Sequence, residues 1–108
     1  MGINYVPRAG LIYVVALTDT MAQVLTKTQA KAIRGFKIKM QFVSGQAPPF
    51  FEIAFSASPT EGATSDGDGV YSISGNGSGD MAAPSNGLWA RVRDAGDTGK
   101  LCEILTWG

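Results

Sequence analysis

Residues 33–55, IRGFKIKMQFVSGQAPPFFEIAF, contain the two clearest alternating patterns of apolar and polar residues in the chain. In the first pattern every second residue is apolar: Phe36, Ile38, Met40 and Phe42. The second pattern repeats this over a shorter run: Phe51, Ile53 and Phe55. A period of two is typical of a strand with one face in a core and one in water, whereas a helix would scatter these side chains around its circumference. Both runs are therefore predicted to be strands.

The two predicted strands are separated by residues 44–49, SGQAPP, which are turn formers that cannot continue a strand ladder. This arrangement predicts a β-hairpin with a long connection. We expect the apolar residues of both strands to face one side, opposite Leu88, Val92 and part of the last strand. Each such side chain contributes roughly 1.5–3 kcal/mol when it is fully buried, so this hairpin would supply the largest share of the core.

Length and composition restrict the class of protein. The chain has 108 residues, which predicts one domain able to bury about two-thirds of its unfolded surface. Nine basic and nine acidic residues balance, so the charge favours neither nucleic acid nor an anionic membrane as a partner. Cys102 is the single cysteine and is interpreted as a small core residue. Abundant glycine without long helix-forming runs indicates short strands joined by turns.

We expect the chain to consist of an amino-terminal arm, residues 1–10, and a single β-sandwich domain, residues 11–108. The arm is irregular, partly apolar and closed by Pro7. Residues 11–17, LIYVVAL, are rich in β-branched and aromatic residues. This composition favours a buried strand over the apolar region of a signal peptide, and seven residues are too few to span a bilayer.

Further short strands are predicted along the rest of the chain, over residues 24–25, 70–74, 88–93 and 100–107. Turns or loops rich in glycine and aspartate are expected between them, over residues 56–69, 75–80 and, as a hairpin turn, 94–99. Residues 26–31 are either a polar connection or one loose helical turn. Seven or eight short strands at this spacing predict an all-β fold, an antiparallel β-sandwich or jelly roll.

Three short motifs suggest binding sites, and each has a simpler interpretation. Residues 66–69, DGDG, begin like a calcium loop, but a valine occupies the third ligand position, which favours a turn. Residues 75–79, GNGSG, lack the following helix and the Lys-Ser/Thr pair of a phosphate loop. Arg91 and Arg93 share one strand face with Trp89, where stacking or an anion contact competes with simple solvation.

Catalytic chemistry has little support in the sequence. The chain contains no histidine, which removes the most common general base and metal ligand. Its carboxylates are expected mostly in turns, where water leaves little reason for strong pKa shifts. No neighbouring base is evident that would activate Cys102. We therefore expect no catalytic residues, no metal site, no cofactor and no enzymatic activity.

The order of segments over residues 24–108 carries a resemblance to a known class of proteins. A polar loop is followed by the strands RGFKIKMQFVS and FFEIAFSASPT, a glycine-rich loop and the ending GLWARVRDAGDTGKLCEILTWG. This layout resembles the small β-rich virion domains of tailed bacteriophages, in which an apolar, aromatic strand often ends the chain. The resemblance implies a β-sandwich or jelly roll on the virion. It implies most often a capsid decoration (cement) protein, and sometimes a head-fibre or tail-associated module.

Two functions stay open at this point. The first is a decoration protein on the capsid surface that clamps neighbouring subunits of the phage major capsid protein, with repeated contacts amplifying a modest affinity. The alternative is a receptor- or glycan-binding module of a head fibre or tail, in which Tyr71, Trp89 or Trp107 stacks on a sugar. In either case we expect no contact with nucleic acid or membrane.

A homodimer or homotrimer is also expected, because the chain has more aromatic surface than one thin sandwich can hide. The residues expected to bind partners are Ile3, Tyr5, Val6, Pro7, Phe50, Trp89 and Trp107. The arm is expected to make the decisive contact, since a short apolar segment can bury its side chains and satisfy its amides by adding to a neighbouring sheet edge.

Overall fold

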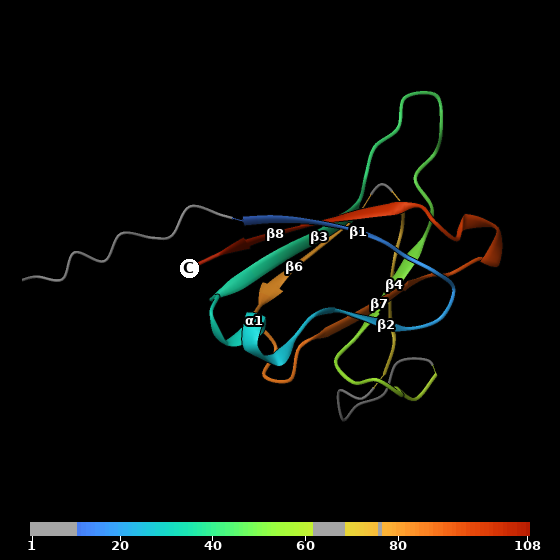
Figure 1. The fold of residues 1–108 in the computed structure, drawn as a ribbon. Helices are drawn as coiled ribbons and strands as arrows, with labels where there is room; N and C mark the ends of the chain where they lie inside the picture. The colour runs from blue at the N-terminus through green and yellow to red at the C-terminus, as the bar shows by residue number, and fades with distance from the viewer. Residues whose placement is uncertain (1–10, 62–68, 76) are drawn as a thin grey trace, which may run out of the picture.

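The computed structural model describes residues 11–61, 69–75 and 77–108. Within these ranges, eight strands form two antiparallel sheets that pack face to face (Figure 1). Sheet A contains, in spatial order, β1 (Leu11–Ala16), β8 (Leu101–Trp107), β3 (Gly35–Met40) and β6 (Ser78–Ala82). Sheet B contains, in spatial order, β2 (Ala22–Leu25), β7 (Leu88–Val92), β4 (Phe51–Ala54) and β5 (Tyr71–Ile73). This arrangement confirms the predicted all-β sandwich.

The strand pairing is that of a jelly roll. Each strand pairs antiparallel with its counterpart from the other end of the chain: β1 with β8, β2 with β7, β3 with β6, and β4 with β5. The chain is thus wound like one long hairpin that is rolled so that successive pairs fall in alternate sheets. Two further pairings, β3 with β8 and β4 with β7, complete the sheets. Of the two architectures predicted, the pairing selects the jelly roll.

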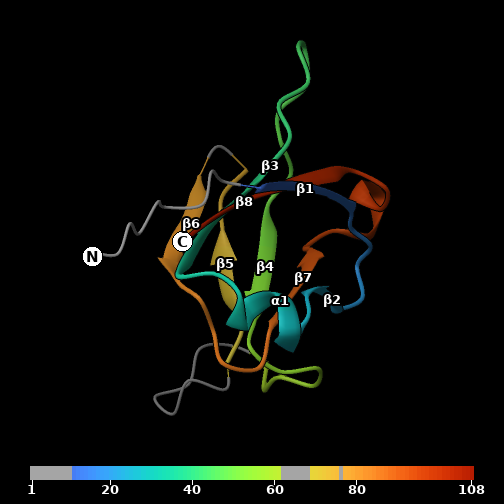
Figure 2. The ribbon, with the colours of Figure 1, turned by 60° about the vertical axis from the view of Figure 1, so that its left-hand side comes forward.

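The predicted hairpin over residues 33–55 is wrong. β3 and β4 lie in opposite sheets, and residues 41–50 cross between the sheets as a loop that projects beyond the sandwich (Figures 1 and 2). The apolar faces of β3 and β4 still contribute to one core, because two packed sheets bury their inner faces against each other. Alternation predicts which face of a strand is buried but does not predict its neighbouring strand.

Two aromatic residues of the alternating runs lie outside the core. Phe42 is 70% exposed and Phe55 is 38% exposed. Both come after the ends of their strands, where the chain has left the ladder and the alternation of side chains no longer holds. Leu88 and Val92 are fully buried, as predicted.

β1 is an edge strand of sheet A. The predicted strand over residues 11–17 therefore exists, but the prediction that it is buried is wrong. Tyr13 and Val15 pack against the core, whereas Ile12 and Val14 point outward and are 66% and 52% exposed. In a sandwich of two sheets each sheet has one covered face, so a continuous apolar run leaves every second side chain uncovered.

The segment between β2 and β3 forms one helical turn, α1 (Lys27–Lys31). Of the two predicted alternatives for residues 26–31, the helical turn is therefore correct. The Thr26 hydroxyl accepts a hydrogen bond from the Gln29 amide, and the Gln29 side chain accepts one from the Thr26 amide. This reciprocal cap satisfies two amides that a helix start leaves free. No helix in the described ranges is long and apolar enough to cross a membrane.

Two other segments differ from the prediction. Residues 75–80 are predicted to be a turn, but residues 78–80 of this segment belong to β6, whose sequence SGDMA contains glycine and aspartate, which are poor strand formers. Its pairing with β3 overrides this weak local preference. Residues 94–99 are not a hairpin turn, because they join β7 and β8 in opposite sheets and contain a short 3₁₀ helix (Ala95–Asp97).

Candidate functional site

Large apolar side chains are exposed in unusual number. In the described part of the chain, eleven of them are 38% exposed or more. Most gather on three surfaces: the outer face of sheet A, the projecting loop of residues 41–50, and the open side of the sandwich between β5 and β6. Surface apolar residues scattered singly need no explanation, but contiguous ones mark contacts.

The broadest of these surfaces is the apolar face, which comprises Ile12, Val14, Leu101, Leu105 and Trp107. It follows from alternation on two neighbouring strands, β1 and β8, whose register places Ile12 opposite Leu105. Trp107 lies opposite Gly35 of β3, and its indole ring would be 2.7 Å from a Cβ atom at Gly35. The missing side chain at Gly35 therefore lets the indole ring lie against the strand backbone.

Charged side chains lie within and beside the apolar face: Glu103 of β8 stands opposite Val14 of β1, and Lys39 of β3 stands opposite Glu103 on its other side. The Lys39 Nζ lies 2.9 Å from the Glu103 Oε1, and the Gln41 side chain donates to the other Glu103 oxygen. The hydrogen bond from Lys39 is the main cause that lowers the pKa of Glu103. Lys37 stands opposite Asp80 in the register of β3 and β6. A hollow of about 300 Å³ lies at this border, lined by Ile12, Lys37, Lys39, Glu103 and Leu105.

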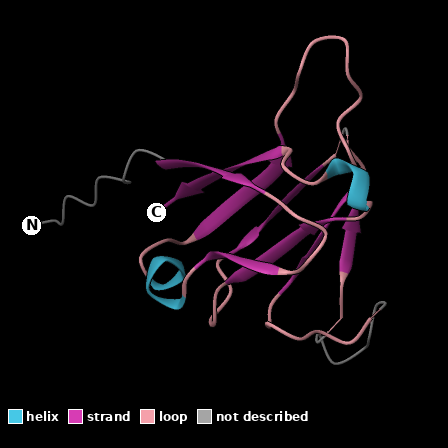
Figure 3. Ribbon diagram, turned by 45° about the vertical axis from the view of Figure 1, so that its right-hand side comes forward, coloured by secondary structure: helices cyan, strands magenta, loops and turns pink. Residues whose placement is uncertain are grey.

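The projecting loop, which extends beyond both sheets (Figure 3), carries exposed apolar side chains. Phe42 is 70% and Val43 45% exposed, and the Gln46 amide closes a turn by donating to the Val43 carbonyl. At the end of the loop the Arg93 guanidinium lies 4.1 Å from the centre of the Phe50 ring. This cation–π contact fixes Phe50 while leaving it 41% exposed.

The edge groove lies on the open side of the sandwich, between β5 and β6, and has a volume of about 410 Å³. It is lined by Ile53, Phe55, Tyr71, Ser78, Gly79, Asp80 and Met81. Tyr71 is 61% exposed. Aromatic rings beside a hydroxyl and a carboxylate can pack on an apolar ligand face and hydrogen-bond to its polar edge.

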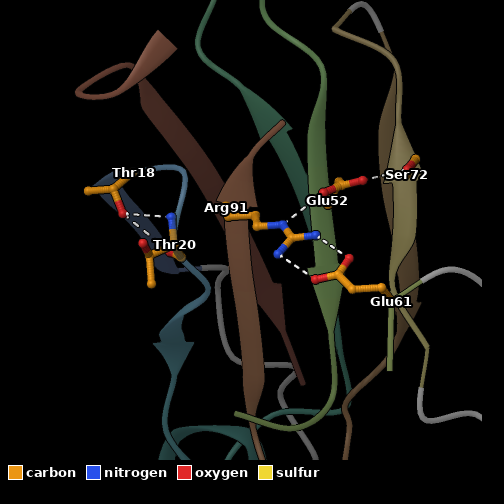
Figure 4. Close-up of polar contacts among 6 residues, drawn as sticks. All are labelled: Thr18, Thr20, Glu52, Glu61, Ser72 and Arg91. Carbon is orange, nitrogen blue, oxygen red and sulfur yellow. Dashed lines mark hydrogen bonds and ion pairs between the residues drawn. The ribbon is translucent and has the colours of Figure 1, made fainter. Parts of the chain in front are cut away.

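Arg91 is engaged by two carboxylates on the outer face of sheet B (Figure 4). Its Nε donates to the Glu52 Oε1 at 2.8 Å, and its two terminal nitrogens donate to the two oxygens of Glu61. Ser72 donates to the other Glu52 oxygen at 3.0 Å. These bonds raise the pKa of Arg91, and the bond from Arg91 lowers the pKa of Glu61. Arg91 and Arg93 are therefore held by partners within the chain.

The structure does not bring together the three predicted partner-binding residues that it describes. Phe50 lies at the end of the projecting loop, Trp89 is partly exposed on the outer face of sheet B, and Trp107 belongs to the apolar face. Four of the predicted residues lie outside the described residues: Ile3, Tyr5, Val6 and Pro7. Residues 66–68 of the calcium-like loop and Asn76 of the glycine-rich segment also lie outside them.

Four surface residues were not predicted from the sequence: Ile12, Val14, Leu101 and Leu105. The available signal was β8, because both faces of this strand carry apolar residues: Cys102 and Ile104 point inward, and Leu101 and Leu105 point outward on either side of Glu103. A strand that is apolar on both faces is typical of a sheet covered on both sides.

Cys102 is a core residue, as predicted. It is fully buried, and burial raises the pKa of its thiol to about 11, so that it stays protonated at neutral pH. Within the ranges that the structure describes, no three His, Cys, Asp or Glu side chains gather as metal ligands would.

Comparisons of the chain with protein-family models, with curated proteins and with solved structures give no match. Function is therefore inferred from the surfaces themselves. The apolar face, the projecting loop and the edge groove are all suited to binding other molecules rather than to burial within this chain.

Proposed function

We propose that this protein is a structural component of a tailed-bacteriophage virion, a capsid decoration (cement) protein that binds and stabilises the lattice of the major capsid protein. The observation that carries the proposal is the exposure of eleven large apolar side chains over the described parts of a 108-residue chain. Exposed apolar surface on this scale is typical of proteins that are covered by partners. The jelly roll occurs in viral capsid domains, which supports the same class by analogy of fold.

The proposed mechanism is burial of surface at a seam between capsid subunits, repeated over the whole capsid. Each contact can be modest, because many copies act on one lattice and reinforce one another. The amino-terminal arm supplies the main contact: Ile3, Tyr5 and Val6 are apolar, and Pro7 with Gly10 separates them from β1. Such a segment can pair with the edge of a capsid subunit's sheet. The projecting loop, with Phe42 and Val43 exposed, supplies a second contact.

The test is binding of the purified full-length chain, and of a variant lacking residues 1–9, to capsids that lack the protein. Because β1 begins at Leu11, the deletion leaves the described sandwich intact. We expect the thermal melt to change little and capsid affinity to fall at least about tenfold, or roughly 1.4 kcal/mol. Failure of the full-length chain to bind would refute the proposed function. Full retention by the truncated chain would move the contact to the projecting loop.

A receptor- or glycan-binding module of a head fibre or tail is the second candidate, and the edge groove is the observation that favours it. Tyr71 and Phe55 present exposed rings there beside the polar groups of Ser78 and Asp80. Trp89 and Trp107 lie on other surfaces, so a sugar would stack on Tyr71 rather than on either tryptophan. Screening on a glycan array with wild type and Tyr71→Ala tests this candidate. Sugar binding that Tyr71→Ala abolishes would favour it over capsid decoration.

A further inference from the structure

The apolar face has no cover within the described chain, although its strand pattern requires one. β8 lies between β1 and β3 in sheet A, and its inner residues pack in the core against sheet B. Its outer residues Leu101, Leu105 and Trp107 remain 38%, 39% and 39% exposed. Together with Ile12 and Val14 of β1 they form an apolar area on neighbouring strands. Glu103, paired with Lys39, lies on the same face between Leu101 and Leu105. A second layer over this area would complete the burial that the pattern indicates.

The size of the face fits association with another folded surface. From their exposed fractions, the five side chains present on the order of 500 Å², which is near the upper end for the largest patch on a monomer. With the bordering residues of β3 and β6, the contact would approach about 800 Å² per partner, the usual size of a stable protein interface.

The charges at the border favour a second copy of this chain over a charged partner. Two lysines, Lys37 and Lys39, stand beside two acids, Asp80 and Glu103, and the pair Lys39–Glu103 is already formed within the chain. The border therefore carries no net charge that would attract a strongly acidic or basic surface. An identical face meets no net repulsion, and each lysine keeps its own acid nearby.

We infer that the outer face of sheet A is a self-association interface at which two copies pack β1 and β8 face to face. A two-fold axis running across the strands lays the apolar strands of one copy on those of the other and leaves β3 and β6 toward the rim. The interface is distinct from the arm and the projecting loop that the proposed function assigns to the capsid. The two proposals can therefore fail independently.

The experiment is sedimentation velocity of the full-length chain from micromolar to about a hundred micromolar, the range in which modest interfaces dissociate. We expect a dimer for wild type and at least a tenfold weaker dimer for Ile12→Lys and for Leu105→Lys. The matched control is Phe42→Lys, because Phe42 is 70% exposed but lies on the projecting loop. The control should remain dimeric. A wild type that stays monomeric or forms trimers, or a control that dissociates as readily as the face variants, would overturn the inference.

A second measurement needs no disruptive variant and separates packing of faces from pairing of β1 edges. The chain has two tryptophans, so Trp89→Phe leaves Trp107 as the single reporter on the apolar face. We expect its fluorescence to shift to shorter wavelength as concentration rises, because the partner's face removes the indole from water. Dimerisation without any change in Trp107 fluorescence would overturn packing through this face.

Discussion

At the scale of single residues, Arg91 forms ion pairs that the neighbouring sequence does not predict. The alternation of Arg91 and Arg93 predicts a basic strand face, yet Arg91 is held between Glu52 of β4 and Glu61 of the following segment. Both acids are at least thirty positions away in the chain. A local pattern can place the arginine on an outer face, but it cannot reveal partners that only the sheet topology brings close.

We expect Arg91→Gln to lower the free energy of unfolding by about 1 kcal/mol, because Glu52 would keep a charge without its strongest donor. The Glu52 side chain is only 14% exposed, so water replaces that donor poorly. The matched control is Glu61→Gln, whose side chain is 72% exposed, so water screens its ion pair and the substitution should lower the stability much less. Urea denaturation measures both changes. Equal effects of the two substitutions would contradict the different burial of the two pairs.

Ile53→Ala tests the register of β4. Ile53 is fully buried in the core, so the substitution should lower the free energy of unfolding by about 2–5 kcal/mol through lost burial and a residual cavity. Phe42→Ala is the control from the other alternating run, and at 70% exposure it should cost less than about 0.5 kcal/mol. Denaturant titration of both variants provides the comparison. A wild-type unfolding midpoint for Ile53→Ala would show that the register is wrong.

At the scale of elements, alternation predicted the inner faces of β3, β4 and β7, and turn residues predicted where most strands end. The sheet to which each strand belongs could not be predicted from alternation. Two strands bury the same side chains whether they pair in one sheet or pack against each other from opposite sheets. β6 escaped prediction because its residues favour turns and its stability comes from β3. The apolar face was not predicted, because a continuous apolar run does not indicate which face of the strand is exposed to solvent.

The loop elements contain a contact that depends on glycine. Gly75, between β5 and β6, lies so close to the projecting loop that a Cβ atom there would collide with the carbonyl oxygen of Pro48. The residue is buried, and the backbone of Pro48 and Pro49 leaves no room for a side chain at this position. The glycine-rich segment is thus partly a packing element.

Gly75→Ala should therefore lower the free energy of unfolding by about 1–3 kcal/mol, as expected for overpacking against a fixed backbone. The control is Gly96→Ala in the 3₁₀ helix, where a Cβ atom meets nothing within 4 Å and the backbone needs no glycine. We expect the control to be neutral or slightly stabilising. Thermal melts of the two variants give the comparison, and a neutral Gly75→Ala would rule out the close packing of the two loops.

At the scale of the whole molecule, the two outer faces of the sandwich differ in character. On the outer face of sheet B, Arg91 is neutralised by two acids of the same chain, whereas the outer face of sheet A is mostly apolar over β1 and β8, with Glu103 paired to Lys39. The projecting loop adds exposed apolar residues at a separate place. We propose that the apolar face joins two copies of the chain and that the loop and the arm contact the capsid.

If this chain is a decoration protein, many copies of it cover each capsid, and the stoichiometry of purified virions tests this. Quantitative mass spectrometry should compare the copy number of this chain with that of the major capsid protein in the same particles. A decoration protein predicts copy numbers of the same order, because each repeating seam of the lattice holds one. A handful of copies per particle, as a fibre or tail component would have, or complete absence from the virion would contradict the account.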